Sequence, residues 1–433
     1  MLKCLSLTAP VAVFAVLAMS CGQHRIAYGG EVARAANDSS IADDWPCWRG
    51  LAGDNHSSDS DPPIHWSATE NIRWEVPIPG RGHASPCVVG SRILLSAADD
   101  TEQTQFLVCL DRATGRQLWQ TDLHHGGFPS VHEFNSHASA TPACDGTIVI
   151  VPFVNSDVLW VSGVTIDGKI AWQQKAGRFR HANGYGSSPT LYENLAIVSN
   201  DNQDESCVIA INRTNGQIVW TVPRPKSDNS ASPIVAHVAG RSQLLLNGAR
   251  EVVSLDPATG EEIWRVNHET EVAANTVAFD EDTVYASGNV PEKLLMAVRA
   301  DGHGDVSDSH VRWRLNRANP YVPSPLVCTD LLFTLLDSGT LICRDKHSGD
   351  EIWKQRLGGN FFSSPVLAGN SLFASSDAGV TYVVRAERSY QLVGKNDIEE
   401  PCKATPVICG GCIYLRTDQH LYCIGADNSR TQK

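Results

Sequence analysis

The stretch that decides the fold reads Cys109-Leu110-Asp111-Arg112-Ala113-Thr114-Gly115-Arg116-Gln117-Leu118-Trp119. It begins in an apolar run, passes an Asp and a Gly, and continues into a second run that carries Trp. The short side chain of Asp111 accepts hydrogen bonds from the amides of a turn. Gly115 adopts the positive φ that a tight turn between antiparallel strands needs. The stretch therefore predicts two neighbouring antiparallel strands.

The same phrase returns along the chain, so a repeat fold is the first hypothesis. A stretched copy keeps Asp308 and Trp313, and the last copy has lost its Trp and reads Tyr390-Gln391-Leu392-Val393. Tryptophan on an outer strand offers a large apolar plate with one N–H donor. We expect one tryptophan per unit to dock that unit on the next, and this set is Trp74, Trp119, Trp172, Trp220, Trp264, Trp313 and Trp353.

A second phrase, two small residues followed by Pro or Thr, precedes an apolar run in every unit. Its eight copies, spaced 40 to 56 residues apart, begin at Ala84, Ala140, Ser188, Ser232, Ala274, Ser324, Ser364 and Ala404. Two more short runs, rich in Val, Ile, Leu and Tyr, separate the two phrases, which gives four strands per unit. Residues 71–425 divide into eight units of about 44 residues. The sequence predicts an all-β, eight-bladed β-propeller of four-stranded antiparallel blades.

The two ends of the repeat region predict how the ring closes. The last unit runs out of chain after three strands, near residue 425. The missing fourth strand stands at the other end, in residues 71–76, where Trp74 has the position of the repeated tryptophan. Pairing this strand with the C-terminal blade would close the ring and remove exposed sheet edges.

The N-terminus predicts export. Lys3 precedes an apolar run from Leu5 to Met19 that is too short for a typical membrane span. Residues 18–21, Ala-Met-Ser-Cys, resemble a lipoprotein box, in which Cys21 would carry a lipid that anchors the chain to a membrane. Ordinary signal-peptidase cleavage, near Cys21 or after residues 33–35, is the alternative. We expect a periplasmic or cell-envelope location.

The predicted organisation has four parts. Residues 1–35 form the signal peptide and a tether, and residues 36–70 form a strap that Trp45, Trp48 and Trp66 pin against the propeller. Residues 71–425 form the propeller, which we expect to be monomeric, and residues 426–433 form a tail. The formal net charge is −13, and such a surface repels phosphate groups, so a nucleic-acid partner is excluded.

Several clusters of reactive residues have structural interpretations that compete with functional ones. The pair Cys409 and Cys412 flanks Gly-Gly, which favours a two-residue hairpin turn over a zinc or redox site. The region with His124, His125, His132 and His137 favours a solvated loop over a metal site. Asp301, Asp305 and Asp308 lack the calcium-loop pattern and predict a surface loop. Most of the 13 cysteines lie in apolar runs, where they act as small hydrophobes. We expect no metal site.

A positional argument selects candidate ligand-binding residues. In a propeller, the loops that lead into the innermost strands surround one mouth of the central channel. These loops precede the small-residue phrases and carry donors, acceptors and aromatic rings that suit a small polar ligand or a peptide segment. Turn formation and solvation are the alternative. The candidates are Arg81, His83, His137, Arg180, His181, Tyr185, Asn229, Glu271, Asn319, Tyr321, Asn360 and Lys403.

The repeat form Asp-x-x-Thr-Gly-x-x-x-Trp, as in residues 111–119 and 256–264, resembles the repeat of pyrroloquinoline-quinone (PQQ) proteins. The outer-membrane assembly lipoprotein BamB shares this repeat. Residues 44–50, 72–74 and 416–424 are similar to the ends of PQQ-like propeller proteins of planctomycete-type bacteria. The resemblance covers residues 44–425 and implies the quinoprotein-like propeller, a fold that enzymes and scaffolds share.

The resemblance leaves several functions open. We expect a non-catalytic binding or scaffold protein, in one version BamB-like, because no catalytic motif is present. The alternative is a PQQ-dependent oxidoreductase of the alcohol or sugar dehydrogenase type, with PQQ and Ca²⁺ on the propeller axis. Many such enzymes carry adjacent cysteines beside the quinone, and this chain has no Cys-Cys pair. A hydrolase or lyase that uses the polar mouth is the third reading. We therefore assign no catalytic residues and no cofactor.

Overall fold

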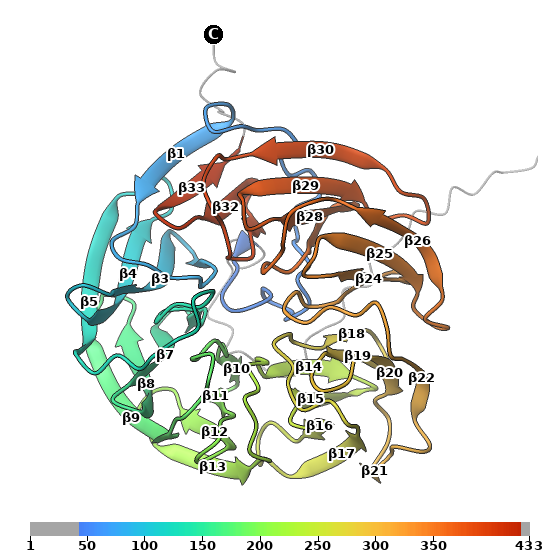
Figure 1. The fold of residues 1–433 in the computed structure, drawn as a ribbon. Helices are drawn as coiled ribbons and strands as arrows, with labels where there is room; N and C mark the ends of the chain where they lie inside the picture. Colours follow the sequence, from blue (N-terminus) through green and yellow to red (C-terminus); the bar gives the residue numbers. More distant parts are fainter. Residues whose placement is uncertain (1–42, 426–433) are drawn as a thin grey trace, which may run out of the picture.

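The computed structural model describes residues 43–425 and shows a ring of eight antiparallel sheets around a central axis (Figure 1). The predicted eight-bladed propeller is confirmed. The signal peptide, Cys21 and the tail lie outside the described residues. Within the described part, no helix is long and apolar enough to cross a membrane.

We number the blades in chain order and give their strands from the axis outward. Blades 1 to 3 contain β2 (Cys87–Val89), β3 (Arg92–Asp99), β4 (Thr104–Asp111) and β5 (Gln117–His125); β6 (Ala143–Cys144), β7 (Ile148–Asn155), β8 (Val158–Thr165) and β9 (Ile170–Arg178); β10 (Thr190–Tyr192), β11 (Leu195–Asn200), β12 (Cys207–Asn212) and β13 (Ile218–Pro223). Blades 4 and 5 contain β14 (Ile234–Val238), β15 (Arg241–Gly248), β16 (Glu251–Leu255), β17 (Glu262–Asn267) and β21 (Gly304–Asp305); β18 (Ala278–Phe279), β19 (Thr283–Gly288), β20 (Leu294–Arg299) and β22 (Val311–Leu315).

The remaining blades follow the same order. Blades 6 to 8 contain β23 (Leu326–Cys328), β24 (Leu331–Leu335), β25 (Thr340–Asp345) and β26 (Glu351–Arg356); β27 (Val366–Ala368), β28 (Ser371–Ser375), β29 (Val380–Arg385) and β30 (Leu392–Asp397); β31 (Val407–Cys409), β32 (Cys412–Arg416), β33 (His420–Ile424) and β1 (Ile72–Pro77). The second and third strands of each blade are buried almost throughout, because neighbouring blades cover both of their faces. The outermost strands alternate between exposed and buried positions.

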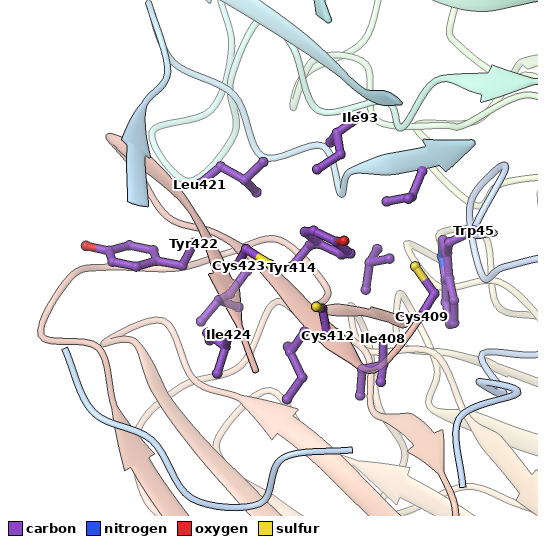
Figure 2. Close-up of a cluster of buried hydrophobic side chains, with 14 of the residues drawn as sticks. Trp45, Ile93, Ile408, Cys409, Cys412, Tyr414, Leu421, Tyr422, Cys423 and Ile424 are labelled. Carbon is purple, nitrogen blue, oxygen red and sulfur yellow. The ribbon is translucent and has the colours of Figure 1, made fainter. Parts of the chain in front are cut away.

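The ring closes as predicted. Strand β1 pairs antiparallel with β33, with Trp74 opposite Cys423 and Pro77 opposite His420. The blue and red ends of the described chain therefore share one blade (Figure 1). A buried cluster joins this blade to blade 1 and includes Trp45, Tyr414 and Leu421 (Figure 2).

Two local features differ from the regular repeat. In the stretched fifth unit, residues Gly304–Asp305 form β21, which pairs with blade 4 instead of blade 5. There β21 runs parallel to β17. This part of the acidic loop is therefore a short fifth strand, although its side chains stay exposed. The added chain covers Trp264, which is 0% exposed and whose Nε1–H donates to Gln243 Oε1.

The cysteine pair Cys409 and Cys412 flanks a hairpin turn, in agreement with the structural interpretation. The two residues are opposite partners across β31 and β32. Gly410 and Gly411 between them have φ of 61° and 71°, the values that a two-residue hairpin turn requires. All eleven cysteines in residues 43–425 are free.

Candidate functional site at the channel mouth

The described part of the strap, residues 43–70, begins inside the ring and then runs outward to β1 at the rim (Figure 1). Near its end, Ile64 and Trp66 bond Asn396 on β30, the outermost strand of blade 7.

Trp45 makes a two-way backbone pairing with Val88 on the innermost strand of blade 1. Two blades away, at blade 7, the Asn55 side chain donates to the Pro365 carbonyl at 2.9 Å. Between these two contacts, Trp48 reaches Thr276 of blade 5, so the strap crosses the axis. Its pairings with Val88 and Leu367 cover inner strand edges that would otherwise stay unpaired.

Arg49 fixes the turn of the strap at the axis. Its guanidinium is buried and donates to the carbonyls of Gly53, Asp54 and Pro325 at 3.0 to 3.2 Å. Burial lowers the pKa of Arg49 to about 10. Because the carbonyls come from both the strap and blade 6, this side chain connects the strap to the propeller.

A cavity of about 320 Å³ lies in the channel on the side of the small-residue phrases. Among the described strap residues, Trp48 alone lines it, and its Nε1–H donates to Thr276 Oγ1 at 2.9 Å. The strap therefore contributes Trp48 to the wall of the cavity.

The wall of the cavity is a ring of hydroxyl groups from the small-residue phrases, which we call the hydroxyl ring: Thr141, Ser188, Ser232, Thr276, Ser364 and Thr405. Except for Thr276, which accepts the indole N–H of Trp48, the hydroxyl oxygens of this ring accept main-chain N–H groups from the preceding blades. The bonds run from Ser85 to Thr141, Thr141 to Ser188, Ser188 to Ser232, and Ser364 to Thr405, at 2.9 to 3.0 Å. The small-residue phrase thus links neighbouring blades and lines the channel at the same time.

Aromatic and charged side chains form the rim of the mouth. Phe134, which is 53% exposed, lies in the loop before blade 2, and its ring centroid is 5.6 Å from that of Phe362, before blade 7. The Lys403 ammonium lies 5.9 Å from the Phe362 ring centroid. These contacts narrow one side of the entrance.

Three of the twelve predicted mouth residues, His83, Tyr321 and Lys403, line the cavity. His83 is mostly buried, and its Nε2 has no hydrogen-bond partner in the described chain. Burial, together with the positive charges of Lys403 and Arg81, lowers the pKa of His83 to about 2. Its imidazole is therefore neutral at physiological pH.

The other predicted residues hold the loops in place instead of lining the cavity. His137 bonds Asp100 and the Pro129 carbonyl, and Tyr185 donates to the Ser199 carbonyl. The further contacts are Arg81 with Ala98 through the backbone, Arg180 with Gln203, His181 with Asn183 and Ser230, Asn229 with Asp201 and Asn247, Glu271 with Arg250, Asn319 with Gly288, and Asn360 with Asp377.

Other lining residues were missed in the selection from sequence. Trp48 comes from the strap, for which the repeat pattern gives no position. Phe134 and Phe362 lie in the expected loops, but side-chain direction there depends on loop geometry rather than on spacing. The hydroxyl ring could have been found from the sequence, since a Ser or Thr recurs in the small-residue phrase before each innermost strand.

The histidine-rich region does not form a cluster. His124 packs against Phe153 and Trp160, His125 contacts Thr104, and His132 lines the mouth. In residues 43–425 there is no group of three or more His, Cys, Asp or Glu side chains that could hold a metal ion.

A family model described as outer membrane protein assembly factor BamB matches residues 57–165 and 103–355. The chain belongs to this family. The solved BamB of Moraxella catarrhalis has a TM-score of 0.58 and 12% identity, over 82% of this chain and 99% of that one. The quinohemoprotein alcohol dehydrogenase of Comamonas testosteroni has a TM-score of 0.52 and 13% identity, over 90% of this chain and 82% of that one. These two likenesses show the fold alone.

A curated relative matches a shorter stretch. The glycerol dehydrogenase large subunit of Gluconobacter oxydans (strain 621H) is 29% identical over 114 residues, which are 26% of this chain and 15% of that protein. The BamB family and quinoprotein dehydrogenases thus share this propeller, so the fold does not choose between scaffold and enzyme.

The cavity of this BamB-family propeller does not fit PQQ with Ca²⁺. Calcium takes six to eight oxygen ligands, commonly with carboxylates among them. In the described chain, the cavity is lined by Lys403, His83 and His132 but by no Asp or Glu. Three cationic or imidazole groups around a wall of hydroxyls are a poor donor set for a hard divalent cation.

Proposed function

We propose that this chain is a non-catalytic binding protein of the cell envelope, and that the cavity at the channel mouth is its binding site. The ligand is a small polar molecule or a peptide segment. The observation that carries the proposal is the cavity of about 320 Å³, in which Trp48 of the strap meets the hydroxyl ring and bonds Thr276. Concave sites of about 300 Å³ with a few convergent polar groups are typical of ligand sites.

The family and the lining support this function over the enzymatic alternatives. Membership in the BamB family supports an envelope location and a protein partner, and export of the chain would place it there. A hydrolase or lyase would need an acid and a base in the cavity, commonly carboxylates or histidines. The described lining has no carboxylate, and its imidazoles are those of His83 and His132. Burial lowers the pKa of His83 to about 2, so His83 carries no proton to donate as a general acid near neutral pH.

A cavity-filling variant tests the binding site. Gly186 lines the cavity, and a Cβ added there meets no heavy atom within 4 Å. Gly186→Leu should project into the cavity and obstruct ligand binding, and Gly186→Ala is the matched control. Native mass spectrometry of protein purified from its own envelope should show a bound species on the wild type and on Gly186→Ala, and none on Gly186→Leu. An occupancy that is equal in all three proteins would contradict the proposal.

Thermal melting tests the dehydrogenase alternative. A ligand at a hundred times its Kd raises stability by about 2.7 kcal/mol. We expect no rise of the midpoint with PQQ plus Ca²⁺. A clear rise that Ca²⁺ alone does not produce would favour the PQQ-dependent oxidoreductase instead.

A further inference from the structure

We infer that the cavity binds a small polyhydroxylated molecule that carries one oxyanion, a carboxylate or a phosphate, as in a sugar acid or a sugar phosphate. The inference rests on the proposed function and adds the charge and the chemical class of the ligand. Three properties of the cavity carry it: an unpaired cation, an unpartnered imidazole beside further cations, and a wall of free hydroxyl donors.

The unpaired cation is Lys403. It is half-buried on the cavity wall, and its contact is with the face of Phe362. In the described chain, it makes no hydrogen bond or ion pair. Lys403 Nζ is not among the buried polar atoms of residues 43–425 that lack a partner, so the ammonium is open to the cavity and to a ligand in it. An anionic group bound at this wall would pair with it.

The unpartnered imidazole is His83. Its Nε2 is shielded from solvent and lacks a hydrogen-bond partner among residues 43–425. The positive charges of Lys403, Arg81 and Arg416 act on it. A buried polar atom left without a partner destabilises the protein. A rotation of the imidazole toward the cavity would expose Nε2, and its N–H tautomer would then donate to an oxygen of the bound anion.

Arg416 extends the positive region behind the wall. It is buried and donates to the carbonyls of Ala84 and Ser96 at 3.1 and 2.8 Å, and no carboxylate forms an ion pair with it in the described chain. The protein as a whole has a net charge of −13. Positive charge thus gathers on the side of the cavity near blades 8 and 1, whereas the Asp337 carboxylate bonds the main chain of Tyr321 and Val322 on the side near blade 6. An anionic group is therefore favoured beside Lys403.

The hydroxyl ring selects an oxygen-rich body for the ligand. The oxygens of Thr141, Ser188 and Ser232 already accept main-chain N–H groups, and Thr276 accepts the indole N–H of Trp48. None of these hydroxyls donates to another group of the described chain, so their hydrogens are available to a ligand. A ring of donors suits a molecule with many oxygen acceptors, and the Trp48 ring offers an apolar surface for the C–H face of a sugar.

Isothermal titration calorimetry of the purified chain tests this inference with four probes: glucuronate, glucose 6-phosphate, uncharged glucose and cationic glucosamine. We expect glucuronate or glucose 6-phosphate to bind at least tenfold more tightly than glucose, and glucosamine to bind more weakly than glucose. Tight binding of the first probe alone assigns a carboxylate, and tight binding of the second alone assigns a phosphate. Acetate and inorganic phosphate test whether the hydroxyl groups of the ligand contribute to binding. If these ions bind as tightly as glucuronate and glucose 6-phosphate, the polyhydroxylated part of the inference is refuted.

Matched variants locate the anion. Lys403→Gln should remove the tenfold preference for the anionic sugar. Lys395→Gln should keep it, since Lys395 also lies above a ring, that of Tyr382, but does not line the cavity. If Lys403→Gln does not fold, Lys403→Arg should keep the preference, and Gly186→Leu should abolish binding of every probe.

Two negative results separate the inference from the proposed function. Equal affinity for glucose and both anions, or an unchanged preference in Lys403→Gln, refutes the anionic ligand. If no probe binds while Gly186→Leu still loses its native occupant, this inference fails and the proposed function stands. If Gly186→Leu also keeps its occupant, the proposed function fails as well.

Discussion

The indole of Trp119 occupies the space that a side chain at Gly168 would need. A Cβ built on Gly168 would lie 2.7 Å from Cδ2 of Trp119, and the Trp119 Nε1–H donates to the carbonyl of Ile166 in the same turn. Trp172 lies in the same way against Gly216 of the next blade. The Gly and the Trp of the repeat are therefore the two halves of one joint between neighbouring blades.

Substitution of the turn glycine should weaken this joint. Gly168→Ala introduces a Cβ at a φ of 86° and directly against the Trp119 ring. We expect a loss of about 2–4 kcal/mol in the free energy of unfolding, from backbone strain and overpacking together. Urea denaturation measures it.

Gly146→Ala is the matched control for the joint. Gly146 lies in the same blade at a φ of 90°, but its added Cβ would meet its nearest atom at 4.0 Å. Gly146→Ala should lower the free energy of unfolding by only about 1–2 kcal/mol, the cost of the strained backbone conformation. Equal losses for the two variants would show that the contact with Trp119 contributes nothing.

Removal of the Trp45 side chain should detach the strap. Trp45 is buried and belongs to the cluster that joins blades 1 and 8 (Figure 2). Trp45→Ala should lower the free energy of unfolding by about 3–5 kcal/mol, the usual cost of deleting a large buried aromatic side chain. Leu51→Ala changes a strap residue that is 53% exposed and should stay within about 0.5 kcal/mol. Limited proteolysis should cut the strap of the first variant and spare that of the second.

A buried ion pair network joins blades 3 and 4. Arg224 bonds Asp201 at 2.8 Å and Glu251 at 3.0 Å, and the Arg224 and Asp201 side chains are both 2% exposed. Arg224→Ala would leave two carboxylates in the interior without their partner, so we expect a loss of about 3–5 kcal/mol.

A surface ion pair provides the comparison for the network. The pair between Arg312 and Asp282 is more exposed, so Arg312→Ala should cost less than about 1 kcal/mol. Urea denaturation of both variants at the same pH measures the two losses. If Arg224→Ala and Arg312→Ala each lower the free energy of unfolding by less than about 1 kcal/mol, a structural role for the network is refuted.

The neutral imidazole of His83 should make stability depend on pH. Its pKa is lowered to about 2 in the folded chain, chiefly by burial, whereas the unfolded chain takes up the proton near pH 6.5. The unfolded state therefore binds more protons as the pH falls below 6.5, and the folded state loses stability until the folded pKa is reached. Between pH 7.5 and 5.5 the wild type should lose about 1.4 kcal/mol more than His83→Gln does.

Other histidines do not obscure this comparison. His124 and His268 have pKa values lowered to about 4 by burial, and both are present in the wild type and in the variant. Their contributions cancel in the difference between the two denaturation curves. Parallel curves from pH 7.5 to 5.5 would mean that His83 takes up a proton in the folded state.

The sequence predicted much of the fold and little of the site. The turns at Gly115 and Gly168 and the small-residue phrases are local signals, because a tight turn or a strand depends on a few neighbouring residues. Of the mouth candidates, His83, Tyr321 and Lys403 line the cavity. The rest are directed toward loop carbonyls and carboxylates, which spacing along the chain does not reveal.

By itself the sequence determined eight four-stranded blades and the closure of the ring by β1, since each unit repeats the residues that its own turns and joints require. Only the tertiary structure decided where the strap lies and which side chains line the cavity in the channel. Trp48 and Thr276 are 228 positions apart, and their side chains meet by a hydrogen bond in the cavity wall. A contact of this kind exists only once all eight blades have formed the ring, because no local pattern encodes the space at the axis that the strap fills.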